Sequence, residues 1–143
     1  MKAKLIQAQD EKTFAVVFDK GDACIAGLLD FAKQHNLNAA RFTAIGAFSD
    51  VTLGFFDRQR MEYQKIPLNA QVEVLSLVGN IALDGDTPKI HAHVVVGKSD
   101  GTAHGGHLLE AHVWPTLEVI VVEAPQHLQR TIDAETGLAL IRL

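Results

Sequence analysis

The sequence predicts a single α+β domain, built on a largely antiparallel sheet of about seven strands with one main helix. Three observations lead to this fold class. The chain has 143 residues, of which 48% are hydrophobic and 21% charged, as in ordinary globular domains. One early segment has helical periodicity, and most later segments are short runs of strand-forming residues. No linker rich in glycine, serine or proline interrupts residues 1–143, so we treat them as one domain.

The main helix is expected at residues 23–36. Its apolar side chains recur at helical spacing and face away from the polar ones, with Ile25, Leu28, Leu29 and Ala32 opposite Asp30, Lys33 and Gln34. Asn36 suits the left-handed conformation that often ends a helix. The single cysteine, Cys24, falls in this segment, so we expect it to pack in the core. One cysteine forms no intrachain disulfide, which fits the reducing cytoplasm.

Strands are expected in the runs that are rich in β-branched, aromatic and other apolar residues. The first covers residues 13–18. The others cover residues 41–48, 51–56, 62–66, 72–81, 89–97 and 117–122, with a last short one at 138–141. Gly46 breaks the second of these runs, and the four prolines are expected at strand boundaries, at Pro67, Pro88, Pro115 and Pro125.

Length, charge and hydropathy exclude several classes of protein. The chain is too short for a TIM barrel, which needs about 250 residues. Its formal net charge is −4, so it lacks the basic footprint of a self-sufficient nucleic-acid binder. No apolar stretch approaches the roughly 18 residues of a membrane helix, and the apolar part of the N-terminus is too short for a signal peptide. We therefore expect a cytoplasmic protein without a membrane partner.

The most informative motif is His91-Ala92-His93 in the predicted strand 89–97. Residues two apart in a strand point to the same face, with their Cα atoms roughly 6.5–7 Å apart. Two imidazoles at that spacing can bind one ion at about 2.0–2.1 Å from each nitrogen. Ala92 and Val94 fall on the opposite face and are expected to face the core.

His107 is the expected third ligand, because Gly105 and Gly106 before it can turn the chain back toward the histidine pair. Three histidines without a fourth protein ligand leave a position for water or a small-molecule ligand, as in catalytic zinc sites. Glu110 or Glu118 could orient one of the rings. Zinc is the expected ion, although imidazoles also accept copper, nickel or iron. The alternatives are histidines hydrogen-bonded on a polar sheet face, and a pH-sensitive interface.

Several motifs together resemble one family, the plants-and-prokaryotes conserved (PPC) domain. The resemblance covers nearly the whole chain, from about residue 14 to residue 122. Its motifs occur in order at residues 44–54 (AIGAFSDVTLG), 73–79 (EVLSLVG), 91–97 (HAHVVVG), 100–101 (DG), 105–108 (GGHL) and 115–119 (PTLEV). The resemblance implies a seven-stranded α/β domain and a homotrimer. It also implies zinc on the three motif histidines, which are His91, His93 and His107 here. Plant members carry AT-hooks that bind A·T-rich DNA, but this sequence has no Arg-Gly-Arg-Pro core.

Three hypotheses for the function stay open at this stage. The first is a metal-binding oligomer with a small-molecule pocket, whose reaction, if any, the sequence does not name. The second is a DNA-associated regulatory protein, on family resemblance alone. The third is a trimeric interaction scaffold, whose contact surface could include Phe55, Phe56 or Trp114, unless these side chains belong to the core.

Overall fold

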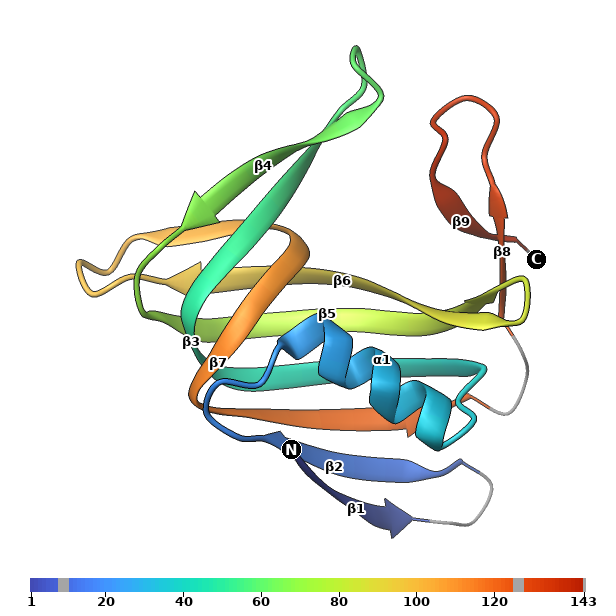
Figure 1. The fold of residues 1–143 in the computed structure, drawn as a ribbon, viewed down its shortest axis with the longest axis horizontal. Helices are drawn as coiled ribbons and strands as arrows, with labels where there is room; N and C mark the ends of the chain where they lie inside the picture. The colour runs from blue at the N-terminus through green and yellow to red at the C-terminus, as the bar shows by residue number, and fades with distance from the viewer. Residues whose placement is uncertain (8–10, 125–127, 143) are drawn as a thin grey trace.

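The structure is a computed structural model that describes residues 1–7, 11–124 and 128–142. Within these residues, the chain forms nine strands and one helix (Figure 1). The helix α1 is Cys24–Gln34. The strands are β1 (Lys2–Gln7), β2 (Thr13–Phe18), β3 (Ala39–Asp57), β4 (Glu62–Leu68), β5 (Val72–Asp84), β6 (Thr87–Gly97), β7 (Ala103–Glu123), β8 (Gln129–Ile132) and β9 (Ala139–Arg142).

All nine strands belong to one sheet, in the order β1-β2-β7-β3-β5-β8-β9, with β4 paired to β3 and β6 paired to both β5 and β7. Neighbouring strands are antiparallel except for β5 and β8, which are parallel at Leu83–Gln129 and Asp84–Arg130. The predicted α+β class and largely antiparallel sheet are confirmed. The expected number of strands was too low, since β1 and β8 were not predicted.

Two predicted strands, at residues 41–48 and 51–56, are one continuous strand, β3. Gly46 marks a bulge inside it, where the register with β5 shifts between Ala44 and Gly46. Its φ is +150°, and a Cβ there would lie 2.3 Å from the carbonyl oxygen of Thr116. Gly46 is therefore needed because β7 approaches so closely, and its interpretation as a break was wrong.

The strand β7 begins much earlier than predicted, since residues 103–116 extend the expected strand 117–122 toward the N-terminus. Pro115 lies inside β7, and Pro67 lies inside β4 rather than at a boundary. Both positions tolerate a residue without an N–H group. The register of β7 with β3 is interrupted between Val113 and Leu117, and β4 is paired only to β3. Pro125 lies outside the described residues.

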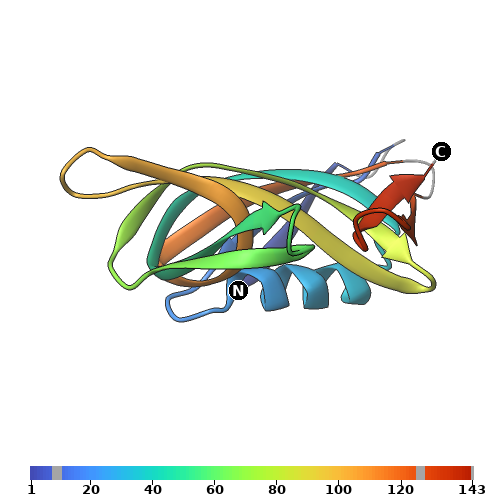
Figure 2. The same cartoon turned by 90° about the horizontal axis from the view of Figure 1, so that it is seen from above.

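The core lies between α1 and the face of the sheet that this helix covers, and Figure 2 shows α1 along one side of the curved sheet. The predicted apolar stripe of the helix is buried at Leu28 and Ala32, and Asn36 has the expected left-handed backbone, with φ 52°. Cys24 is buried as predicted, and burial raises the pKa of its thiol to about 12. A thiol with that pKa is not a nucleophile near neutral pH.

The opposite face of the sheet carries no helix in the described part of the chain and exposes several apolar side chains. They are Ile45, Leu75, Val78, Val95 and Ile120, between 41% and 61% exposed. We call this set the open face. Phe55 lies near the C-terminal end of β3 and is 64% exposed. The expectation that its side chain belongs to the core was therefore wrong. Trp114 is partly exposed, with the ammonium group of Lys20 3.4 Å from its ring centre.

Candidate metal centre

The strand β6 presents His91 and His93 on one face, as the His-X-His spacing predicts. Ala92 and Val94, which alternate with them, are 2% exposed and belong to the core. The Nε2 atoms of the two histidines lie 3.2 Å apart. Two nitrogens bound to one tetrahedral ion at about 2.05 Å would be separated by about 3.3 Å. The two rings are thus already spaced as ligands of a single ion.

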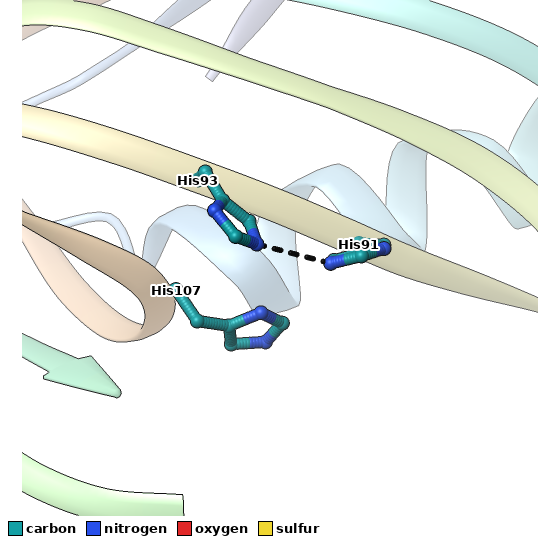
Figure 3. Close-up of side chains that lie close together, drawn as sticks. All are labelled: His91, His93 and His107. Carbon is teal, nitrogen blue, oxygen red and sulfur yellow. Dashed lines mark hydrogen bonds between the residues drawn. The ribbon is translucent and has the colours of Figure 1, made fainter. Parts of the chain in front are cut away.

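The third ring comes from β7, where His107 is the register partner of His93. The ring centre of His107 lies 5.1 Å from the ring centre of His91 and 5.4 Å from that of His93. Figure 3 shows the three rings together. One nitrogen from each ring falls within 4.8 Å of the other two. The three histidines therefore lie close enough together for one ion to contact all of them.

The expected way in which His107 reaches the site was wrong. Gly105 and Gly106 do not form a bend, because both lie within β7 and pair with Val95 and Val94 of β6. The chain reverses earlier, in the turn at residues 98–102. A Cβ on Gly106 would lie 2.9 Å from the carbonyl oxygen of Gly54, so glycine here allows β3 and β7 to approach closely.

The protein environment favours the neutral form of two of the rings, His91 and His107. Burial, together with the charges of His91 and His93, lowers the pKa of His107 to about 4. Burial also lowers the pKa of His91, with smaller contributions from His93 and Arg130. Neutral imidazole is the form that binds a metal ion, so His91 and His107 are held in the form that a metal site requires.

The expected carboxylate partner is not found among the described contacts of the three rings. Glu110 and Glu118 are exposed and form no hydrogen bond with any of them in the described part of the chain. The neighbour of His107 is instead Tyr63 of β4, whose hydroxyl oxygen lies 3.5 Å from Nδ1 and whose ring is 4.7 Å away. Tyr63 can therefore fix the orientation of this imidazole.

The other two histidines of this region do not join the site. His104 pairs with Val96, at the far end of the β6–β7 ladder from His91. The Nδ1 atom of His112 lies 2.8 Å from a carboxylate oxygen of Asp50. That hydrogen bond raises the pKa of His112 and lowers the pKa of Asp50.

A cavity of about 260 Å³ lies beside His91 and His107, and the sequence analysis did not predict it. Its wall is completed by the β8–β9 hairpin, which is joined to the sheet by the pairing of β8 with β5. The remaining lining residues include Tyr63, Lys89, Ile90, Arg130, Ile132 and Leu140. No spacing pattern in the sequence connects Arg130 with the histidines. Only the parallel pairing of β8 with β5 brings them together.

Comparison with known proteins agrees with the fold. The model of the Plants and Prokaryotes Conserved domain, abbreviated PCC or PPC, matches residues 6–125. A PPC protein from Pyrococcus horikoshii superimposes with a TM-score of 0.87 at 29% identity, over 99% of this chain and 95% of that one. A metal-containing protein from Archaeoglobus fulgidus superimposes with a TM-score of 0.86 at 33% identity, over 98% of this chain and 99% of that one. A candidate DNA-binding protein from Bacteroides thetaiotaomicron superimposes with a TM-score of 0.88 at 25% identity, over 98% of this chain and 96% of that one.

A curated relative is much longer than this chain. The bifunctional protein GlmU from a Synechococcus strain is 31% identical over 110 residues, which are 75% of this chain but 16% of that protein. No helix among the described residues is long and apolar enough to cross a membrane. The order of the motifs, the sheet topology and the match over residues 6–125 lead to one conclusion: the chain belongs to the plants-and-prokaryotes conserved domain family.

Proposed function

We propose that this protein binds a divalent transition metal, most readily zinc, through His91, His93 and His107, and that the ion keeps a position open for a small ligand. The observation that carries this proposal is the 3.2 Å separation of two Nε2 atoms with a third imidazole beside them. The metal-containing relative from Archaeoglobus fulgidus, at 33% identity, supports it.

The donor set fits zinc well. Three neutral imidazoles with no carboxylate form the kind of three-ligand site in which zinc keeps a fourth position for water or substrate. With zinc bound, such a site polarises an oxygen of the ligand and lowers the pKa of bound water to about 7. The protein's own contribution is to hold the rings at this spacing on two paired strands and to position His107 through Tyr63.

Metal analysis of protein purified without a histidine tag tests the proposal. We expect about one zinc ion per chain in the wild type and none above background after His91→Ala, His93→Ala and His107→Ala are combined. His104→Ala is the matched control, since it removes a histidine from the same β6–β7 hairpin. Equal zinc contents in the wild type and the triple variant would eliminate the site.

We also propose that the protein is a homotrimer whose subunits meet through the open face. Monomeric proteins rarely expose a contiguous apolar patch of more than a few hundred Å². The patch here is continuous across the sheet, because Thr43 pairs with Ile120 on one side and with Val78 on the other. Val78 in turn pairs with His93, so the open face runs up to the histidine cluster.

Sedimentation equilibrium tests the trimer. The wild type should have three times the mass of one chain at micromolar concentration, and Val78→Lys combined with Ile120→Lys should give monomers. Ile132→Lys is the control, because Ile132 is 63% exposed on the β8–β9 hairpin, outside the open face. A wild-type protein that stays monomeric as its concentration rises would contradict the proposal.

The charge of the protein disfavours DNA as a partner. The formal net charge is −4 per chain, and a trimer would repel a polyanion at long range. Arg60, at the tip of the β3–β4 hairpin, lies 3.9 Å from Asp57, which partly neutralises it. We therefore expect no retention of an A·T-rich duplex at about 150 mM salt, where weak electrostatic association fades.

A further inference from the structure

A buried arginine lies beside the histidine cluster. Arg130, on the short strand β8, is only 5% exposed and is the one buried charged side chain in the described part of the core. Together with His91 and His107 it lines the 260 Å³ cavity. Burying a guanidinium costs free energy unless it is paired with hydrogen-bond acceptors or with a negative charge.

The described partners of Arg130 are all neutral. One Nη atom donates to the backbone carbonyl oxygen of Ala139 at 3.1 Å, and the other donates to the side-chain oxygen of Asn80. Nε is buried and has no partner among the described residues. A guanidinium has five N–H donors, so these two contacts leave three unused.

An acid lies opposite Arg130 in the pairing of β5 with β8, but it does not neutralise this charge by direct contact. Asp84 is the register partner of Arg130, but its carboxylate forms an ion pair with Lys89, at 2.9 Å. Burial lowers the pKa of Arg130, and the attraction of Asp84 offsets only part of that shift. No aspartate or glutamate lines the described wall of the cavity, whereas Lys89 and Arg130 both do.

The cavity has the dimensions and lining of a site for a small molecule. Its volume is slightly below the roughly 300–1,000 Å³ of sites for drug-sized ligands. Apolar side chains cover much of its wall. Arg130 lies near the imidazoles in that wall, because Asn80, to which it donates a hydrogen bond, is the register partner of His91. A ligand in it can therefore contact Arg130 and the histidine cluster at the same time.

We propose that this cavity binds a small anionic ligand whose carboxylate or phosphate group pairs with the Arg130 guanidinium, while another of its oxygens reaches the metal held by the three histidines. This inference rests on the proposed metal function and specifies the chemical class of the ligand. In the competing interpretation, Arg130 only fastens the β8–β9 hairpin to β5 through Asn80 and Ala139.

Cobalt-loaded protein provides the test, because the visible spectrum of Co²⁺ reports ligands that enter its coordination sphere. Four probes would be titrated: imidazole, glycolate, its neutral counterpart glycolamide, and inorganic phosphate. Imidazole reports the open position without using a negative charge. Comparing the affinities for glycolate and glycolamide isolates the effect of the ligand's charge. Comparing the affinities for glycolate and phosphate distinguishes the two kinds of anion.

In the wild type, glycolate or phosphate should bind more tightly than glycolamide. Arg130→Gln should weaken binding of the anion roughly ten- to hundredfold, as expected for lost hydrogen bonds between charged groups, and leave imidazole binding unchanged. Arg130→Lys should give an intermediate loss. Arg142→Gln is the matched control, since it removes an exposed arginine from the neighbouring strand β9, and it should behave like the wild type.

A direct observation of Arg130 keeps the test valid even if Arg130→Gln fails to fold. The Nε–H resonance of Arg130 in the zinc-loaded wild type should shift on saturation with whichever anion binds. Unchanged anion affinity in a folded, cobalt-loaded Arg130→Gln protein would overturn the inference, and so would an unshifted Arg130 resonance. Failure of the wild type to take up cobalt or zinc would instead contradict the metal site itself.

Discussion

Gly79 offers a sharp test of how the fold supports the metal centre. It lies in the middle of β5, with Phe42 of β3 as one register partner and Ala92 of β6 as the other. A Cβ on Gly79 would lie 2.3 Å from Cζ of Phe42 and 2.6 Å from the carbonyl oxygen of His91. Both distances are far inside van der Waals contact, so Gly79→Ala must displace a buried ring or the backbone that carries a ligand.

The size of the effect follows from two opposing contributions. Overpacking a well-packed core costs about 1–3 kcal/mol. Replacing a strand glycine by alanine returns about 0.5–1 kcal/mol through the lower entropy of the unfolded chain. Because both contacts are shorter than 3.0 Å, the upper part of the overpacking range applies, about 2–3 kcal/mol. The free energy of unfolding should therefore fall by roughly 1–2.5 kcal/mol, which lowers the midpoint of thermal unfolding by roughly 2–10 °C. Zinc affinity should fall as well, because β6 shifts at His91.

Urea unfolding at a fixed protein concentration, with and without zinc, measures both effects. Gly97→Ala is the control, since the three atoms nearest to its Cβ would all belong to the side chain of Leu75 and none would be closer than 3.2 Å. In a Phe42→Leu background, Gly79→Ala should cost less than in the wild type, because part of the clash is gone. A Gly79→Ala protein as stable as the wild type would refute the steric argument.

Three further predictions address other parts of the molecule. Zinc at about 100 times its Kd should stabilise the wild type by about 2.7 kcal/mol, or roughly 5–10 °C in a thermal melt, and this shift should vanish in His107→Ala but not in His104→Ala. A shift that survives in His107→Ala would show that zinc binds elsewhere. The Asp50–His112 pair should add at most about 1 kcal/mol, because its side chains are 40% and 42% exposed. Its contribution should be complete between about pH 4 and pH 6.5, where both groups are charged, and should be lost as pH rises through the raised pKa of His112 or falls through the lowered pKa of Asp50. A double-mutant cycle of Asp50→Asn and His112→Gln by urea unfolding at pH 5.5 and pH 8.5 measures it, and equal coupling at both values would contradict this assignment. Cys24 should react with a disulfide reagent at neutral pH only on global unfolding, so rapid labelling of the native protein would show that its burial is wrong.

Local sequence patterns were sufficient to predict the helix and the strands whose two faces differ in polarity. The strand Thr13–Phe18 has its predicted bounds, and α1 lies inside the predicted range. Residues 103–116 were missed because glycines and histidines interrupt the apolar pattern there, although residues 103–107 pair with β6 and residues 107–113 pair with β3. Pairing with neighbours stabilises such a strand, and a single-segment pattern does not report pairing.

The residues of the proposed metal centre also differ in whether local patterns or long-range contacts determine their positions. His91 and His93 follow directly from the two-residue period of a strand. His107 lies beside this pair as predicted, but the expected local reason was wrong, since register and not a bend places it beside His93. Tyr63 and Arg130 come from β4 and β8, which meet the site only through the order of strands in the sheet. That order depends on contacts distant in sequence, so no motif reveals it.

The pairing of His93 with His107 has an evolutionary consequence. These two side chains are held by adjacent hydrogen-bonded strands, so their separation does not depend on the turn that joins them. That turn, at residues 98–102, is closed by its own hydrogen bonds from Lys98 to Thr102 and from Gly101 to Lys98. Its tip can therefore gain or lose residues without disturbing the chemistry. Descendants of this domain are free to build new recognition surfaces there while inheriting the same trio of imidazoles.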